Sequence, residues 1–518
     1  MKKYLILLLI IIFASILRFY GNNYDLPYVF NPEEPYIMDK AVEVADGKLD
    51  HGIILRGSLP YYVTGLTIKL ATIFYPSFLQ GQQFITQAYK INKTPFYIIG
   101  RSICVLYSLI EIIVIFHIGK LLFTPSIGLI AAFLTSISIL SINFSHKITP
   151  DTALSATILF SIYLILSAYK RNSYRLFLIS AFFVGFSMAQ KIVGIFVFPV
   201  LLVSLLASKI FKNINKKRKI AMLIGITLIP FITFFLSYPF LFLDVDKLIK
   251  EWSWENETIA WGELVIRDIG LFGRINKYLI KSINFGTGSF ILILSSIGIL
   301  ISLHIKKIEA IFLILFTLIF LIGISIPIPN YDDWVLPLVS FVSLFTSVSI
   351  KKSIKISQKV SKKIKAFILF SLLLFVIIPP LMKSIFTTIL YKSSDTRTME
   401  NEWLERNNIK EEKILRDLYT SKYIPEKMLT KVGFSNLSNY DYYIASDYFF
   451  SRFFIQENIL PEKANMYRIV FNNYLKIKEF RPAIVNTYRN DLEFLLSVNK
   501  WFTHQIKGPI ISIYKIKK

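Results

Sequence analysis

Two carboxylates beside a predicted helix are the first side chains of this sequence that can perform chemistry. Glu33 and Glu34 lie in the sequence Asn-Pro-Glu-Glu-Pro, just before segment 36–45, whose apolar residues recur with helical spacing. A helix N-terminus favours ionised carboxylates. At a membrane surface such a group can act as a general base toward a hydroxyl or an amide. The alternative is that these acids only stabilise the start of the helix.

A second carboxylate, Asp151, ends the stretch 143–151 and directly precedes the apolar segment 152–168. At the end of a membrane helix its ionisation depends strongly on its surroundings, which suits a catalytic or substrate-contacting group. Capping of the helix is a compatible structural role. His146 in the same stretch can bind a metal or a phosphate, or serve as a hydrogen-bonded structural group.

Lys191 is the strong charge between two long apolar runs, and we expect it on the same side of the membrane as the carboxylates. A cation between apolar helices usually has a partner, and we favour an anionic lipid phosphate. Snorkelling to lipid head groups is the alternative. Trp252, Trp254 and Trp261 can stack on sugars or form an interfacial aromatic belt.

The composition indicates what must position these side chains. The 518 residues are 54% hydrophobic and only 18% charged, whereas soluble proteins are about one quarter charged. The net charge of +25 comes mainly from basic loops between apolar runs, so no nucleic-acid partner is expected. Cys104 is the single cysteine, which excludes an intrachain disulfide.

The apolar runs predict an all-α polytopic membrane protein with about eleven transmembrane helices. The predicted spans are 4–20, 96–120, 125–142, 152–169, 174–190, 192–208, 220–241, 287–303, 308–326, 334–350 and 366–388.

The basic loops face the cytoplasm by the positive-inside rule, which places the N-terminus inside and the C-terminus outside. Parity then makes 60–76 an interfacial helix within a long first external loop, 21–95. A third external loop spans 242–286. We therefore divide the chain into a transmembrane domain, 1–390, and a small external α/β or α+β domain, 391–518. Cleavage of 4–20 as a signal peptide is an alternative.

The order of these features resembles the GT-C superfamily of integral-membrane glycosyltransferases, specifically family 39, the dolichyl-phosphate-mannose mannosyltransferase-like group. The matching motifs are Asn31–Tyr36 for the first loop, Gly100–Ser102 for the second span, Ser145–Asp151 for the second loop and Gly185–Lys191 for the Gly-Leu-Ala-x-x-x-Lys stretch. Asp395–Arg397, Trp403 and Ile513–Lys515 resemble the external domain of prokaryotic members.

The resemblance implies a glycosyltransferase of the plasma membrane with an extracytoplasmic active site, a polyprenyl-phosphate sugar as donor, and a protein, lipid or polysaccharide acceptor. Glu33, or alternatively Asp151, would be the base of an inverting displacement, with Glu34, His146, Lys191, Arg101, Trp252 and Trp254 in substrate binding. No metal site is assigned, and a divalent cation at Glu33, Glu34 and Asp151 is left open.

Two departures from the family pattern matter. Glu33 stands where aspartate is usual, and Asp333-Trp334 replaces an Arg-Tyr pair, so a phosphate-binding arginine is missing there. Lys191, Arg101 or a cation would have to compensate. A flippase for lipid-linked sugars and an inactive assembly subunit are the competing hypotheses; the crowding of acids outside the spans, with Glu111 the exception, disfavours transport.

Overall fold

The computed structural model divides the chain into two compact units, one of them discontinuous in sequence. The helical unit comprises Met1–Asn22 and Tyr36–Thr387, and the sheet unit comprises Asn23–Pro35 and Thr388–Lys518. The structure describes residues 2–31, 33–52, 57–242, 246, 270–305, 308–326, 331–421, 429, 434–455, 457–458, 460–483 and 505–516.

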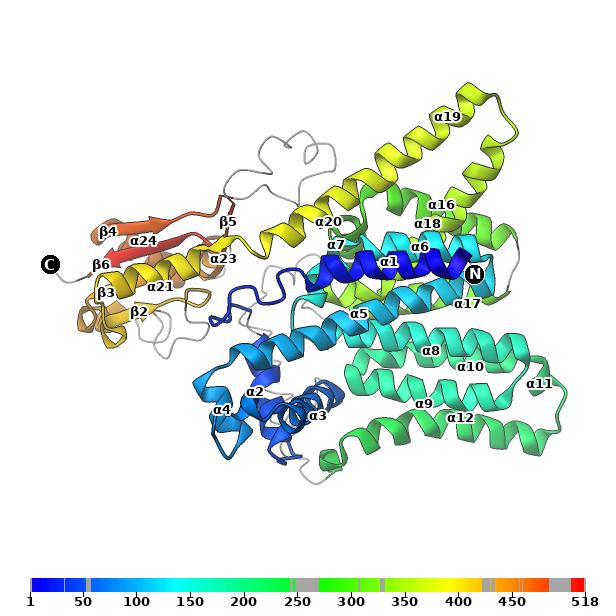
Figure 1. The fold of residues 1–518 in the computed structure, drawn as a ribbon, viewed down its shortest axis with the longest axis horizontal. Helices are drawn as coiled ribbons and strands as arrows, with labels where there is room; N and C mark the ends of the chain where they lie inside the picture. The colour runs from blue at the N-terminus through cyan, green and yellow to red at the C-terminus, as the bar shows by residue number, and fades with distance from the viewer. Residues whose placement is uncertain are drawn as a thin grey trace. The chain divides into compact units, whose positions relative to one another are not determined.

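Helices occupy the predicted apolar segments of the helical unit (Figure 1). They are α1 (Lys2–Phe19), α5 (Thr94–Leu122), α6 (Pro125–Ser136), α7 (Ile139–Ser145), α8 (Asp151–Arg171), α9 (Tyr174–Gln190), α10 (Phe198–Ala207), α12 (Lys216–Ser237), α16 (Ser289–His304), α17 (Ile308–Ser325), α18 (Leu336–Ser357), α19 (Lys362–Ser371) and α20 (Ile378–Leu390). Several begin at side-chain caps, such as Ser173 before α9 and Asn215 before α12, which satisfy otherwise free backbone amides.

Within the described residues, six helices are long and apolar enough to cross a membrane, or eight if each of two bent helix pairs is one span. One bent pair, α6 with α7, turns by 60°. The protein is thus multi-helical and has the apolar helices of a multi-pass membrane protein. The count of eleven spans and their orientation stay predictions.

The first external loop of the prediction contains helices, as expected. α2 (Glu33–Ala45), α3 (Leu59–Phe74) and α4 (Ile85–Ile91) lie between α1 and α5. α3 covers the segment predicted to be interfacial. Its length of 16 residues falls below the roughly 20 that a span needs.

Two helices form the centre of the helical unit. The most apolar stretches of α8 and of the helix that contains α18 are 83% and 89% buried, against 17% for α12. Glu111 on α5 joins these central helices, because it accepts hydrogen bonds from Ser155 (2.9 Å) and Ser340 (2.6 Å). α9 and α12 approach closely at Gly185, where a Cβ would lie 2.3 Å from the carbonyl oxygen of Pro230. The ends of α8 and α9 are therefore held by dense packing.

The sheet unit contains a four-stranded mixed sheet in the order β2-β3-β6-β4, in which β2 and β3 are parallel and β6 is antiparallel to both neighbours. β1 and β5 form a separate parallel pair. The strands are β1 (Ser394–Asp395), β2 (Ile414–Arg416), β3 (Tyr442–Ser446), β4 (Leu475–Phe480), β5 (Ile506–Lys507) and β6 (Ile511–Lys515); the longer helices are α21 (Thr396–Arg406), α23 (Asp447–Ile455) and α24 (Pro461–Asn473).

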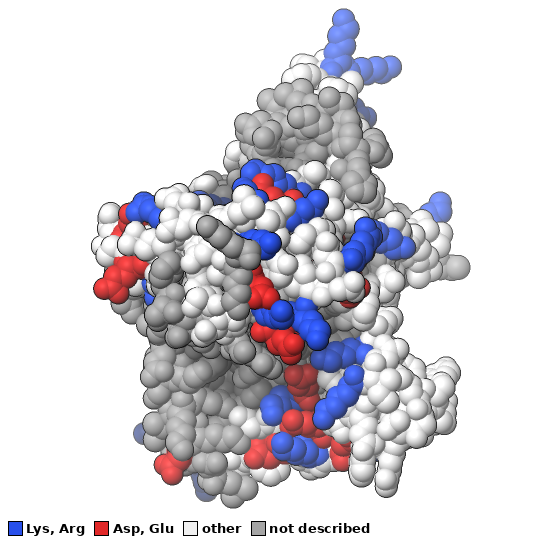
Figure 2. All heavy atoms as spheres, turned by 90° about the vertical axis from the view of Figure 1, so that its left-hand side faces the viewer, with Lys and Arg blue, Asp and Glu red and all other residues white. Residues whose placement is uncertain are grey.

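The surface charge is mixed rather than uniformly basic on the face drawn in Figure 2. There, Lys and Arg side chains lie beside Asp and Glu side chains. A duplex or single strand of nucleic acid needs a continuous positive surface. The charge on this face therefore gives no support for such a partner.

Candidate active site

Lys191 lies at the break between α9 and the short helix η2 (Ile192–Val197), in an extended conformation. The chain turns back at once, because the backbone amide of Gly194 donates to the carbonyl of Lys191 (2.9 Å). Only glycine fits there, since a Cβ would lie 2.5 Å from the carbonyl carbon of Ser187. The lysine side chain is thus carried by a tightly built turn.

Two carboxylates hold the Lys191 ammonium. Its Nζ lies 2.7 Å from Asp151 Oδ1 and 3.4 Å from Asp333 Oδ2, and 5.4 Å from the ring centre of Trp334. These residues come from α8, from the α9–η2 turn and from the short helix η6 (Asp332–Val335). We call Asp151, Lys191 and Asp333 the Lys191 cluster.

The Lys191 cluster combines burial with one open side. Asp151 is 1% exposed, whereas the Lys191 side chain is 18% exposed. Asp151 Oδ2 has no hydrogen-bond partner among the described residues. The same is true of the Oγ1 atoms of Thr149 and Thr152. A buried carboxylate oxygen without a donor costs free energy, so this oxygen is suited to accept a hydrogen bond from a ligand hydroxyl or a water.

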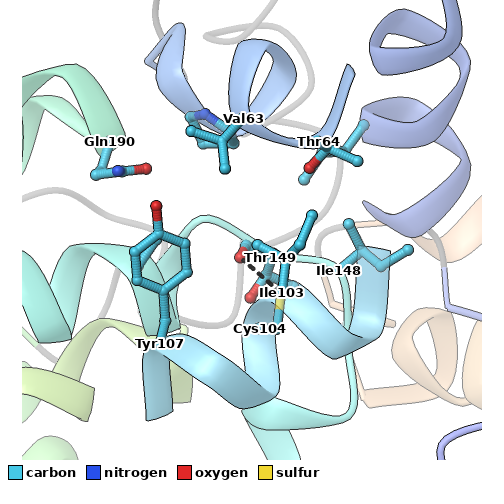
Figure 3. A pocket seen from close by; sticks show the side chains of 11 residues that line it. Val63, Thr64, Ile103, Cys104, Tyr107, Ile148, Thr149 and Gln190 are labelled. Atoms are coloured by element: carbon cyan, nitrogen blue, oxygen red, sulfur yellow. Dashed lines mark hydrogen bonds between the residues drawn. The ribbon is translucent and has the colours of Figure 1, made fainter. Parts of the chain in front are cut away.

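A small pocket is lined by Gln190 and Thr149, which are close in sequence to Lys191 and Asp151. Figure 3 shows the hydroxyl of Tyr107 and the amide of Gln190 pointing toward one another across it. Apolar side chains such as Val63 and Ile103 form the rest of its lining, and Thr149 also faces it. The space is about 20 Å³, which is room for a single water.

His146 and Arg101 form a different group, in which both side chains are fully buried. The His146 ring lies 2.9 Å from the carbonyl of Ile142 and 3.0 Å from that of Tyr20, and Arg101 donates to the carbonyl of Asn22 (3.1 Å). Burial lowers the pKa of His146 to about 4, so its ring is neutral near pH 7. These contacts fix the chain that follows α1; a role in substrate binding stays a prediction.

Glu33 and Glu34 differ from their predicted placement in one respect. We expected both acids to precede the helix, but α2 already begins at Glu33, so both lie in its first turn. Asn31 explains the earlier start, because its Oδ1 accepts a hydrogen bond from the backbone amide of Glu33 (3.0 Å). Glu34 is fully buried and Glu33 is half-buried.

Some of the predicted residues lie outside the described part of the chain. These are Trp252, Trp254 and Trp261, so their stacking stays untested.

The divalent cation that the sequence left open at Glu33, Glu34 and Asp151 stays open. Within the described ranges, no three His, Cys, Asp or Glu side chains gather around one possible metal position. In addition, Asp151 already pairs with Lys191.

Comparisons with known proteins give one family match and several matches to solved structures. Residues 85–236 match the family described as dolichyl-phosphate-mannose-protein mannosyltransferase. The oligosaccharyltransferase of Archaeoglobus fulgidus, solved with a tethered acceptor peptide, has a TM-score of 0.56 at 11% identity, covering 89% of this chain and 72% of that chain. Its structure with an inhibitory peptide and a dolichol-phosphate matches with the same score at 12% identity and the same coverage.

A weaker match is ArnT from Cupriavidus metallidurans bound to undecaprenyl phosphate, with a TM-score of 0.42, 14% identity, and coverage of 77% of this chain and 72% of that chain. No protein of curated function matches. The chain shares the fold of the Archaeoglobus fulgidus oligosaccharyltransferase. The predicted resemblance to the dolichyl-phosphate-mannose mannosyltransferase-like group is confirmed by the family match and by the shared fold.

Asp333 was not predicted to be a partner of Lys191. In the sequence it stood out only as a departure from the family pattern. The available signal was an acid at the start of an apolar segment, the same arrangement that singled out Asp151.

Proposed function

We propose that this chain transfers a sugar from a polyprenyl-phosphate donor to an acceptor at the extracytoplasmic face of the cell membrane. The observation that carries the proposal is the Lys191 cluster, a partly open cation held by two carboxylates at the ends of apolar helices. The matching family is described by a dolichyl-phosphate-linked sugar, and the archaeal relative was solved with a dolichol-phosphate. These names support a lipid-linked donor.

The proposed reaction is a single displacement with inversion. The acceptor oxygen forms a bond to the anomeric carbon while the bond from that carbon to the phosphate oxygen breaks. The acceptor proton passes to a carboxylate, and the electron pair of the broken bond leaves on the polyprenyl phosphate. Because phosphate is already a fair leaving group, a nearby cation can replace a general acid.

Each residue of the Lys191 cluster has a distinct role in this proposal. Lys191 stabilises the charge that develops on the departing phosphate, and the two carboxylates hold its ammonium in place. Asp151 Oδ2, which lacks a partner among the described residues, accepts a hydrogen bond from a substrate hydroxyl. Glu33 is the proposed base, with Asp151 the alternative, and Glu34 positions the substrate.

The proposal includes the predicted topology. A transmembrane domain, 1–390, would contain about eleven spans and the loops 21–95 and 242–286. An external domain, 391–518, would complete the extracytoplasmic side. The sheet of residues 414–515 fits the predicted α/β or α+β class of that domain.

The test compares donor consumption in proteoliposomes that carry a panel of polyprenyl-phosphate sugars and an acceptor extract. We expect Glu33→Gln to lower turnover by about 10² to 10⁴-fold, the contribution typical of a general base. The same assay of Asp151→Asn decides between the two carboxylates. Glu43→Gln is the matched control, because Glu43 also lies on α2 but pairs with Lys40 and Lys48 near the surface.

Full activity of Glu33→Gln would refute its assignment as the base. Movement of the donor between leaflets without release of polyprenyl phosphate would favour the flippase. Inactivity of the wild type with every donor would favour the assembly subunit.

A further inference from the structure

The segment that carries Glu33 belongs structurally to a distant part of the chain. Asn23–Pro35 groups with Thr388–Lys518 in the sheet unit, although both its neighbours in sequence lie in the helical unit. Two basic side chains of the same unit, Arg397 and Lys507, make polar contacts with this segment.

Arg397 holds the segment at Phe30. Its guanidinium is first oriented by Asp395, through a pair of hydrogen bonds of 2.8 Å (Nε to Oδ1) and 2.7 Å (Nη2 to Oδ2). The same guanidinium donates to the carbonyl of Phe30 (Nη1, 3.3 Å) and lies 4.2 Å from the centre of the Phe30 ring. Asp395 is fully buried and Arg397 is 13% exposed. This contact is therefore largely shielded from water, and the shielding strengthens it.

Lys507 holds the segment at Asp25. Its Nζ lies 2.9 Å from Asp25 Oδ1 and donates to the carbonyl of Tyr391 (3.0 Å). The ammonium also lies 5.1 Å from the centre of the Tyr24 ring, which packs against Tyr391 at 4.8 Å. The Asp25 side chain is 7% exposed. Removing one partner of a buried ion pair costs much more free energy than removing one partner of a surface pair.

Both contacts lie shortly before Glu33 in sequence. Phe30 is fixed by Arg397, and Asn31 next to it bonds to the Glu33 backbone amide. Ordering each backbone residue costs about 1 to 2 kcal/mol, so an unanchored loop would not hold a carboxylate still. Catalytic groups need placement to within about 0.5 Å.

We propose that Arg397 and Lys507 are positioning residues, which fix segment 23–35 so that Glu33 is presented to the acceptor. Residues near the C-terminal end of the sequence would then set the position of a carboxylate near its start. This inference rests on the proposed function, because it takes Glu33 as the base.

The experiment is a double-mutant cycle in the full chain, with Lys507→Met and Asp25→Asn. Asn suits position 25, where φ is +57°, because it tolerates the left-handed region. We expect Lys507→Met to lower kcat by roughly 10 to 100-fold with little change in KM, because a misplacement near 1 Å has that effect. In the Asp25→Asn background the further loss should shrink to less than about threefold.

Amide hydrogen exchange over segment 23–35 is the second readout. It should accelerate in Lys507→Met and in Arg397→Gln, while Lys476→Met leaves both exchange and kcat unchanged. Lys476 is the matched control because it pairs with Glu479 (2.7 Å) at the surface of the same unit.

Unchanged kcat in Lys507→Met, or equal losses in both backgrounds of the cycle, would overturn the inference. Exchange does not depend on turnover, so wild-type protein that transfers no sugar would refute the proposed function alone. Faster exchange at 23–35 would still establish the anchoring, and unchanged exchange would refute it.

Discussion

Two clusters of this protein share the same composition, one cation between two carboxylates, but differ in how completely they are paired. In the sheet unit, Arg416 donates to Glu400 and to Glu411, the latter at 2.9 and 2.7 Å. Both oxygens of Glu400 accept further hydrogen bonds from Ser421, at 2.9 Å. In the helical unit, Asp151 has one oxygen on Lys191 and the other without a partner among the described residues.

The comparison distinguishes a charged cluster that stabilises the fold from one that can bind a ligand. Arg416 is 2% exposed, and each oxygen of Glu400 accepts at least one hydrogen bond. Lys191 is 18% exposed, and its cluster retains an unused acceptor. A fully satisfied cluster stabilises the fold, whereas an incompletely satisfied one keeps capacity for a ligand.

The largest expected effect is on the stability of the sheet unit, which contains the cluster of Arg416, Glu400 and Glu411. Arg416→Met would leave the buried Glu400 without its cation and should destabilise the sheet unit by about 3 to 5 kcal/mol. Hydrogen exchange of β2 and β3 in the full chain measures this. Lys476→Met, at an exposed pair, should cost less than about 1 kcal/mol. Equal exchange in the two variants would refute the structural role of Arg416.

The second effect concerns the Lys191 cluster and is measured on turnover. Lys191→Met should lower kcat by about 10² to 10³-fold, because it removes the charge that stabilises the departing phosphate. Turnover of donor to free polyprenyl phosphate measures this. Lys147→Met is the control, since Lys147 is a nearby half-buried lysine that lies over the ring of Phe144 (5.0 Å). Wild-type turnover in Lys191→Met would show that this cluster, too, is only structural.

The third effect is a dependence of stability on pH in the sheet unit. Burial raises the pKa of Asp417 to about 7, although the hydroxyls of Tyr443 and Tyr467 oppose the shift by donating to it. The folded state therefore binds a proton that the unfolded state releases from about pH 4 upward. The stability that this proton confers is complete below about pH 4 and is lost as pH rises through 7.

Between about pH 4 and pH 7 the free energy of unfolding should fall by up to about 1.4 kcal/mol per pH unit. Thermal unfolding at pH 5 and pH 8 measures it, and Asp417→Asn should flatten the curve. An unchanged slope in that variant would assign the pH dependence to other groups.

Local patterns predicted the helices of this protein well, because long apolar runs and caps are properties of neighbouring residues. α9 (Tyr174–Gln190) has the bounds predicted from the sequence, and α17 ends one residue earlier than predicted. The start of α2 was misplaced because the role of Asn31 as a hydrogen-bond acceptor is a matter of side-chain geometry. Hydrophobicity does not reveal it.

The pairing of charges could not be predicted in the same way. Lys191 was expected to have a partner, but Asp151 and Asp333 lie 40 and 142 residues away in sequence. No periodicity connects positions so far apart. For the same reason nothing in segment 23–35 indicated that Arg397 and Lys507 would hold it, since tertiary packing alone brings them together.

The discontinuous sheet unit also sets an order of events during synthesis. Asp25 is made long before Lys507, which at ribosomal speeds of about 5 to 20 residues per second means a wait of roughly 25 to 100 s. The segment that carries Glu33 emerges first yet reaches its final contacts last. Its maturation is thus tied to completion of the chain, so a polypeptide interrupted before position 507 would carry the carboxylate without the Lys507 anchor.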